Sequence, residues 1–161
     1  MGAIDVGNAA TDRSASGTSG RHFIDSSNPA NATGIITSIE VWAATDMTEF
    51  QVATLYLVSG TIYKVRAIQT IGNVTAGSKQ TFPVSLAVVA SDLLGCFFNI
   101  GSLEADTSGG AGIFYKAAEN AYVVGEEVEY TALAWNISLY GTGVSPVKAG
   151  LIPKLIAMGQ L

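Results

Sequence analysis

The feature that most constrains the fold is a period-two alternation of apolar and polar residues through the middle of the chain. In "GIITSIEVWAA" this alternation places Ile35, Thr37, Ile39, Val41 and Ala43 on one face of a strand, and Ser38, Glu40 and Trp42 on the other. Similar runs follow at 49–60, 61–71 and 79–90, separated by turn residues. No window inside 21–143 shows the 3.6-residue period of an amphipathic helix. The pattern therefore predicts an all-β fold.

The number and spacing of the runs narrow the fold class further. About seven to nine strands at intervals of roughly ten to twelve residues are typical of an antiparallel β-sandwich, and we expect a jelly-roll-like one. The run at 49–60 is apolar on both faces, which predicts a strand covered on both sides. Pro83 has no N–H for a ladder bond, so its run is predicted to be an edge strand or to contain a bulge.

The chain divides into three parts by composition. Residues 1–20 form a strand followed by a small, polar stretch, and are predicted to be an extended N-terminal arm. Residues 21–143 are the sandwich domain, and residues 144–161 are a C-terminal tail interrupted by prolines. The tail carries more large apolar side chains than a free end should, which predicts that it docks on this subunit or on another. These are Leu151, Ile152, Leu155, Ile156, Met158 and Leu161.

Low charge indicates which partners the surface favours. Charged residues are 13% of the 161, against roughly 25% in an ordinary domain, and the mean hydropathy is +0.37. Covering such a surface desolvates few ions, so we expect a homo-oligomer, for example a trimer. The net charge of −5 and only eight Lys and Arg argue against nucleic acid as a partner. The most apolar stretch, 84–98, is interrupted by polar residues, which argues against a membrane-spanning segment.

The residues that could carry chemistry are few. His22 and Cys96 are the only histidine and cysteine, and neither lies in a recognisable catalytic motif. We interpret His22 as an ordinary strand residue and Cys96 as a packed apolar thiol in a chain made in a reducing cytoplasm. The sequence thus predicts a protein that is not an enzyme.

Acidic residues are interpreted as parts of turns. Asp92 precedes a strand, Glu104 and Asp106 belong to a loop tip, and Glu126, Glu127 and Glu129 form a solvated acidic turn. The prediction is that no cofactor is bound. Calcium near Asp92, Glu104 and Asp106 is the alternative, although their spacing matches neither the EF-hand nor the nonapeptide calcium pattern.

Trp42 lies on the predicted outer face of its strand, and two roles remain open for it. It could pack at a subunit interface, or it could form a sugar-stacking platform with Tyr63, Tyr115, Tyr122 or Tyr140.

Several phrases of the chain, taken together, carry a resemblance. "IDVGNAATDR", "NPANATGIITSIEVWAATDM", "IGNVTAGSKQTF", "VVASDLLG" and "ISLYGTG" resemble an uncharacterised β-sandwich module that recurs in phage and environmental viral proteins, often virion-associated ones. The likeness covers about residues 3–143 and rests on turn and strand phrases. Such modules usually stop near "SLYGTG", so the tail is not covered by it.

The resemblance implies a phage virion structural protein that is assembled in the host cytoplasm and resides in the virion. We expect a capsid decoration or cement protein, or a head-fibre subunit, which binds itself and other virion proteins. In this hypothesis the N-terminal arm and the tail bury apolar side chains on neighbours. The alternative is a carbohydrate-binding module of a tail or fibre that recognises host glycans.

Overall fold

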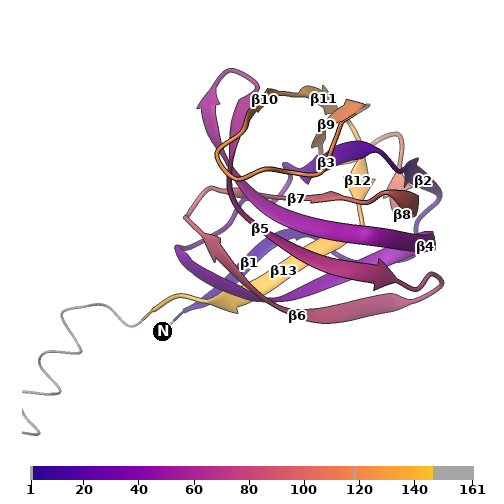
Figure 1. Ribbon diagram of the computed structural model, residues 1–161, viewed down its shortest axis with the longest axis horizontal. Coiled ribbons are helices and arrows are strands. Elements are labelled where there is room, and N and C mark those ends of the chain that lie inside the picture. The colour runs from indigo at the N-terminus through magenta and orange to yellow at the C-terminus, as the bar shows by residue number, and fades with distance from the viewer. Residues whose placement is uncertain (1, 118, 147–161) are drawn as a thin grey trace, which may run out of the picture.

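A computed structural model describes residues 2–117 and 119–146 as an antiparallel β-sandwich (Figure 1). No helix among these residues is long and apolar enough to cross a membrane. The strands are β1 (Ala3–Asn8), β2 (Ala15–Thr18), β3 (Arg21–Asp25), β4 (Gly34–Ser59), β5 (Ile62–Val74), β6 (Lys79–Val88), β7 (Leu93–Phe97), β8 (Ile100–Asp106), β9 (Ile113–Ala117), β10 (Glu127–Glu129), β11 (Thr131–Leu133), β12 (Asn136–Ile137) and β13 (Leu139–Val144). The predicted all-β class is confirmed.

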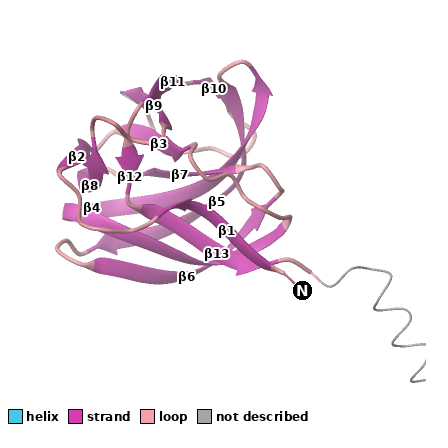
Figure 2. Cartoon of the chain, turned by 180° about the vertical axis from the view of Figure 1, so that it is seen from behind, coloured by secondary structure: helices cyan, strands magenta, loops and turns pink. Residues whose placement is uncertain are grey.

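The strands form two main layers and a short side sheet. Sheet A has the order β1, β13, the first part of β4, and β6. Sheet C has the order β10, β5, the last part of β4, β7, β3, β9 and β11. Sheet B joins them through the middle of β4, which pairs with β8, and β8 pairs with β2 and β12. Figure 2 shows β1, β13 and β6 along the face seen from behind.

Strand β4 belongs to all three sheets, because it is 26 residues long and changes layers along its length. Its register against β5 shifts between Met47 and Phe50, and Glu49 lies there with φ of +53°. A bulge of this kind bends a strand and increases its twist. The two runs that the sequence shows at 34–44 and 49–60 are therefore parts of one strand.

The main core fills the space between sheets A and C. Ile36, Ile39 and Leu86 contribute to it from sheet A, and Phe23 and Phe50 from sheet C, all fully buried. Leu103 of β8 closes the side. This is the shared apolar layer that the alternation predicts.

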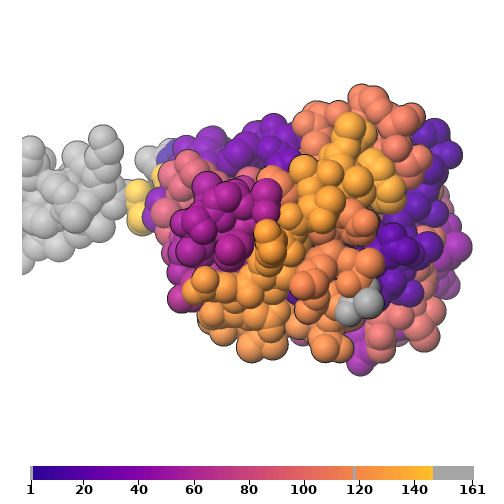
Figure 3. Space-filling model, turned by 90° about the horizontal axis from the view of Figure 1, so that it is seen from above, coloured from indigo at the N-terminus to yellow at the C-terminus, as the bar shows by residue number. Residues whose placement is uncertain are grey.

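A second core lies on the opposite side of sheet C. It is covered by residues 119–130, called here the covering segment, which anchors Tyr122, Val128 and Tyr130 against Leu55 and Phe97. Figure 3 shows this segment in orange beside the magenta tip of the β4–β5 hairpin. Residues 50–55 of β4 are buried on both faces as a result, as the sequence predicts. The prediction is wrong for the end of the run at 49–60, because Leu57 and Val58 lie beyond this cover and are exposed.

The outer part of β4 differs from the sequence prediction at one point. Ile36 is buried, whereas Ile35 and Thr37 are exposed. The cause is a bulge: the register against β6 shifts between Ile36 and Ser38, so the face changes there. Pro83 pairs with Ser38 at this bulge, on a strand that among the described strands pairs with β4 alone. Both readings of Pro83, edge strand and bulge, are confirmed.

The N-terminal residues pack within their own chain. Ala3–Asn8 pairs along its whole length with β13, and Ile4 and Val6 are 1% and 0% exposed. These apolar side chains are therefore part of the sandwich, and the hypothesis that they dock on a neighbour is wrong. The predicted tail residues Leu151, Ile152, Leu155, Ile156, Met158 and Leu161 lie outside the described residues.

Candidate functional site

The outer face of sheet A carries Trp42 and is the broadest candidate for a binding surface. We call it the A face, and its apolar side chains are Ala3, Ile35, Trp42, Pro83, Ala87 and Val144. Trp42 lies on the same side of β4 as Ser38 and Glu40, as predicted, because the residues between them point into the core.

An apolar row crosses the A face from one edge to the other. Val144 pairs with Ala3 on one side and with Ile35 on the other, and Ile35 pairs with Ala87. Directly paired residues of antiparallel strands share a face, so these four side chains are neighbours. Ile35 is 40% and Val144 44% exposed, which leaves a continuous apolar stripe over four strands.

The charges at the A face already have partners. Glu40 lies 3.7 Å from the Nζ of Lys79. The Asp5 carboxylate accepts hydrogen bonds from Tyr140 Oη at 3.1 Å and from Asn28 Nδ2 at 2.9 Å. A partner that covers this face therefore desolvates few unpaired ions, and burial of charge is the costly part of an interface.

The aromatic platform predicted around Trp42 is much smaller than the sequence allowed. Tyr140 pairs with Glu40 and shares the A face. Tyr63 and Tyr115 belong to sheet C, and Tyr122 is a residue of the covering segment that is buried in the second core and 2% exposed. Only Tyr140 of the four predicted partners therefore lies on the same face as Trp42.

His22 lies in a buried polar cluster rather than at an open site. Its Nδ1 is 2.7 Å from Tyr130 Oη, its Nε2 is 2.6 Å from the carbonyl oxygen of Asn120, and its ring stacks on Tyr122 at 3.8 Å. A carbonyl can only accept, so Nε2 carries the hydrogen and Nδ1 accepts from Tyr130. Burial lowers the pKa of His22 below its ordinary 6.5, against the opposing effect of the Asn120 bond. The neutral ring thus ties β3 to the covering segment.

Cys96 is fully buried in the main core, as predicted. Burial alone raises the pKa of its thiol far above the ordinary range. A thiol that stays protonated is a poor nucleophile, so Cys96 is a packing residue.

The three acids proposed as a calcium site have separate partners. Asp92 binds the guanidinium of Arg66 and accepts the N–H of Val89 at 2.9 Å, which is the turn role predicted for it. Arg13 binds both of the other acids. Its backbone N–H donates to the Glu104 carboxylate at 2.7 Å, and its Nη1 donates to the Asp106 carboxylate at 2.8 Å. In the described ranges no group of three or more acids, His or Cys is placed to hold a metal ion.

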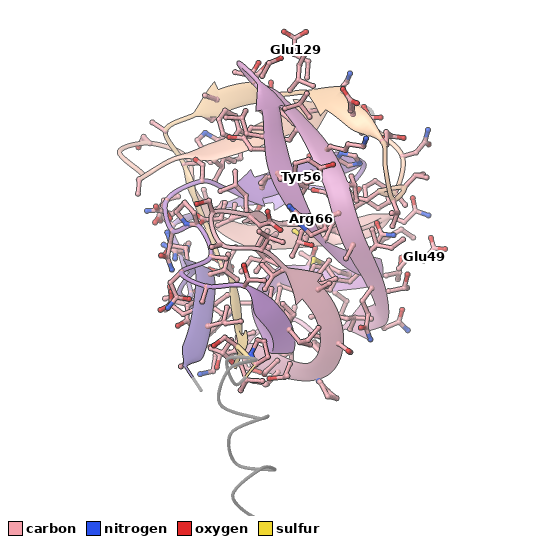
Figure 4. The ribbon with its side chains drawn as sticks, turned by 90° about the vertical axis from the view of Figure 1, so that its left-hand side faces the viewer. Glu49, Tyr56, Arg66 and Glu129 are labelled. Atoms are coloured by element: carbon pink, nitrogen blue, oxygen red, sulfur yellow. The ribbon has the colours of Figure 1, made fainter. Side chains whose placement is uncertain are left out.

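The acidic turn is divided between exposed and half-buried positions. Glu127 and Glu129 are exposed on β10, whereas Glu126 is half-buried. Glu127 lies 3.8 Å from the Nζ of Lys64 on the paired strand. Figure 4 shows Glu129 projecting from the end of the molecule.

A hollow of about 330 Å³ lies where the covering segment meets sheet C, and sequence reasoning did not single it out. Its lining residues come from four separate parts of the chain, so no local motif could have indicated it. They are Glu49, Gln51, Thr70, Phe97, Asn99, Asn120 and Ala121. The one local signal is the β-strand run around Glu49, which is interrupted by a charged residue at the bend of β4.

The chain matches no protein-family model, and no curated protein matches it significantly. The function therefore has to be argued from the surfaces themselves.

Proposed function

We propose that this protein is a phage virion structural subunit, a capsid decoration or cement protein or a head-fibre subunit, that acts by binding copies of itself and neighbouring virion proteins. The observation that carries the proposal is the A face, with its apolar row across four strands and its paired charges. The resemblance of the strand and turn phrases to virion-associated modules supports the same reading.

The size of the A face indicates that it is one part of a larger interface. Four strands spaced about 4.8 Å apart and eight residues of β4 at about 3.3 Å each cover roughly 450 Å². A stable interface buries about 800 Å² on each partner. The A face would supply about half of this area, so a second contact region is required.

The C-terminal tail is the segment that we assign to this second region. Val144 belongs to the apolar row itself, so the chain continues toward residues 147–161 directly from the A face. Six large apolar side chains in the tail would contribute roughly 1.5 kcal/mol or more each when buried, before the cost of ordering them. A tail that docks on a neighbouring copy would join the two regions into one interface.

A charge placed in the apolar row tests the A face. Ile35→Lys should weaken self-association about tenfold or more, because it buries an unpaired ammonium. Val124→Lys is the matched control: Val124 is 56% exposed, but it lies in the covering segment. Sedimentation velocity over a concentration series measures the association, and thermal unfolding checks that both variants fold. Equal association of Ile35→Lys and the wild type would refute the role of the A face.

The location of the protein tests the virion assignment separately. Mass spectrometry of purified particles should find the chain in an amount that corresponds to many copies per particle. A chain found in infected cells but missing from particles would contradict the assignment, whatever its oligomeric state.

Glycan recognition at Trp42 is the second candidate, because Trp42 and Tyr140 share one face. Trp42→Ala separates the two functions. Loss of glycan retention with intact association favours a lectin-like role for the A face, and loss of association favours the structural role.

A further inference from the structure

The hollow beside the covering segment is lined by polar groups around an aromatic floor. Glu49, Thr70, Asn99 and Asn120 provide a carboxylate, a hydroxyl and two amides, and Phe97 provides the apolar surface. Phe97 is 6% exposed, so only an edge of its ring is open to a ligand. The combination of apolar floor and convergent polar groups is typical of small-ligand sites.

The hollow's rim is held in place by specific contacts. Glu49 is one of two non-glycine residues with positive φ in the described ranges, and its carboxylate accepts a hydrogen bond from Asn99 Nδ2. The Asn99 N–H donates to the carbonyl of Thr48 at 3.0 Å, which fixes the other side of this pair. Figure 4 places Glu49 at the surface, well apart from Tyr56 and Arg66. The bend at Glu49 thus supplies a carboxylate at the rim of the hollow, and Asn99 holds it there.

The opposite wall is fixed from beneath. The Gln51 side chain is 6% exposed and binds the backbone of Tyr122 twice, accepting its N–H at 2.8 Å and donating to its carbonyl at 3.3 Å. The carbonyl of Asn120 accepts the Nε2–H of His22. The buried side chains of Gln51 and His22 therefore position Asn120 and Ala121. Because this wall is already ordered, binding of a ligand should cost little conformational entropy.

Several hydrogen-bonding atoms at the rim are available to a ligand. The hydrogen bond between Glu49 and Asn99 uses Oε2 of Glu49 and Nδ2 of Asn99. It leaves the other carboxylate oxygen of Glu49 and the amide oxygen of Asn99 to accept from a ligand. Within the described residues the side chains of Thr70 and Asn120 make no hydrogen bond, so each can donate and accept. The array therefore matches a ligand with several neighbouring groups that both donate and accept.

We propose that this hollow binds one neutral pyranose residue of a saccharide. Sugar hydroxyls donate to carboxylate and amide oxygens and accept from amide N–H groups, and C–H groups of the sugar ring can contact the exposed edge of Phe97. The volume of about 330 Å³ is at the low end for ligand sites, which fits one ring and not a nucleotide or a large apolar ligand. Glu49 and the net charge of −5 disfavour anionic ligands.

The proposal is independent of the A face. The hollow is built from the last part of β4, from β5, from the end of β7 with the link that follows it, and from the covering segment, and none of these belongs to the A face. The A face belongs to sheet A. Sugar binding and self-association can therefore fail separately.

Titration of the ¹⁵N-labelled full chain with neutral monosaccharides tests the proposal. The probes are the methyl glycosides of glucose, galactose, mannose and N-acetylglucosamine. At least one should shift the amide signals of Thr70, Asn99, Asn120 and Ala121, while the indole signal of Trp42 stays unchanged.

Variants locate the binding and control for charge. Glu49→Gln and Asn120→Ala should each weaken binding of that probe about tenfold, since the first replaces a charged acceptor of sugar hydroxyls by a neutral amide and the second removes an amide group. Glu129→Gln, an equally conservative change at an exposed glutamate of β10, should bind as the wild type does. The proposal is overturned if no probe shifts these signals, if the shifts centre on Trp42, or if both hollow variants bind normally. Sedimentation of Glu49→Gln should show unchanged association, which keeps this test separate from that of the A face.

Discussion

At the level of single residues, the second core and the adjoining turn hold two buried ionisable groups with different kinds of partner. Asp92 is 2% exposed and forms a salt bridge with Arg66, whose guanidinium also lies 4.3 Å above the ring of Tyr56. His22 is fully buried and stays neutral, because Tyr130 and Asn120 satisfy one tautomer. A buried charge needs an ion partner, whereas a buried neutral imidazole needs only one donor and one acceptor.

The burial of neutral His22 predicts a pH dependence of stability. Its pKa is lowered by burial in the folded chain, so the unfolded chain binds the proton more readily. The contribution of His22 to the free energy of unfolding should therefore be fully present above pH 6.5. It should decrease as the pH falls below that value, by at most about 1.4 kcal/mol per pH unit. Urea unfolding between pH 7.5 and pH 5, roughly the range where an imidazole titrates, measures this slope.

His22→Gln provides the control for that slope. His22 is the only histidine, so the variant should lose the dependence in this range, while amide exchange of Tyr122 becomes faster as the covering segment loosens. Glu119, which favours the charged imidazole, is the nearby acid that acts on the group. An identical slope in wild type and variant would show that His22 does not titrate as its burial implies.

At the level of the strands, two glycines allow sheet A to close around its bulge. A Cβ at Gly143 would lie 2.0 Å from the carbonyl oxygen of Ile35, and one at Gly34 would lie 2.3 Å from that of Val144. The register between β13 and β4 shifts at this point. The close approach of the two backbones requires glycine, since no side chain fits between them.

Gly143→Ala should therefore destabilise the fold by about 2 kcal/mol, because the added methyl forces two backbones apart. Thr142→Ala, at the half-buried neighbouring position, is the control and should cost less than about 1 kcal/mol. Chemical denaturation of the two variants gives the difference. Equal stabilities would mean that the strands separate here at little cost.

The strands also show which parts of the fold the sequence could predict. Alternation predicts the strands at 61–71 and 79–90 and the double burial of residues 50–55, because these depend only on neighbouring pairs. It also predicts one strand over "EYTALAWNISLYG", residues 129–141, whereas β11, β12 and β13 belong to sheets C, B and A in turn. Alternation says which side chains share a face, and it does not say to which sheet a face belongs.

The candidate sites were predictable to a lesser extent. Trp42 was placed on an outer face, because two buried neighbours determine its direction. The bulge after Ile36 reversed the expected sides of Ile35 and Thr37, so the apolar row was missed. The hollow needs Glu49, Asn99 and Asn120 together, and these meet only through the tertiary arrangement.

At the level of the whole molecule, the two outer faces of the sandwich differ. The covering segment buries much of the outer side of sheet C, whereas the A face keeps its apolar row exposed. The low charge of the chain, 13% of residues, is therefore combined with an exposed apolar row on sheet A. This asymmetry favours association through sheet A and leaves the hollow beside the covering segment accessible.

The last prediction concerns the tail. A chain that ends at Pro146 keeps every described strand, so its unfolding temperature should match that of the full chain, while its self-association should weaken by tenfold or more, at least about 1.4 kcal/mol. Ile156→Ser should reproduce part of this loss, because it removes one large apolar contact, and Gln160→Ser should not. Sedimentation equilibrium of the four proteins separates the outcomes. If the shortened chain associates as strongly as the full one, the tail is not the second contact region, and the remaining area has to come from the edges of sheet A, where β1 and β6 each pair with a single described strand.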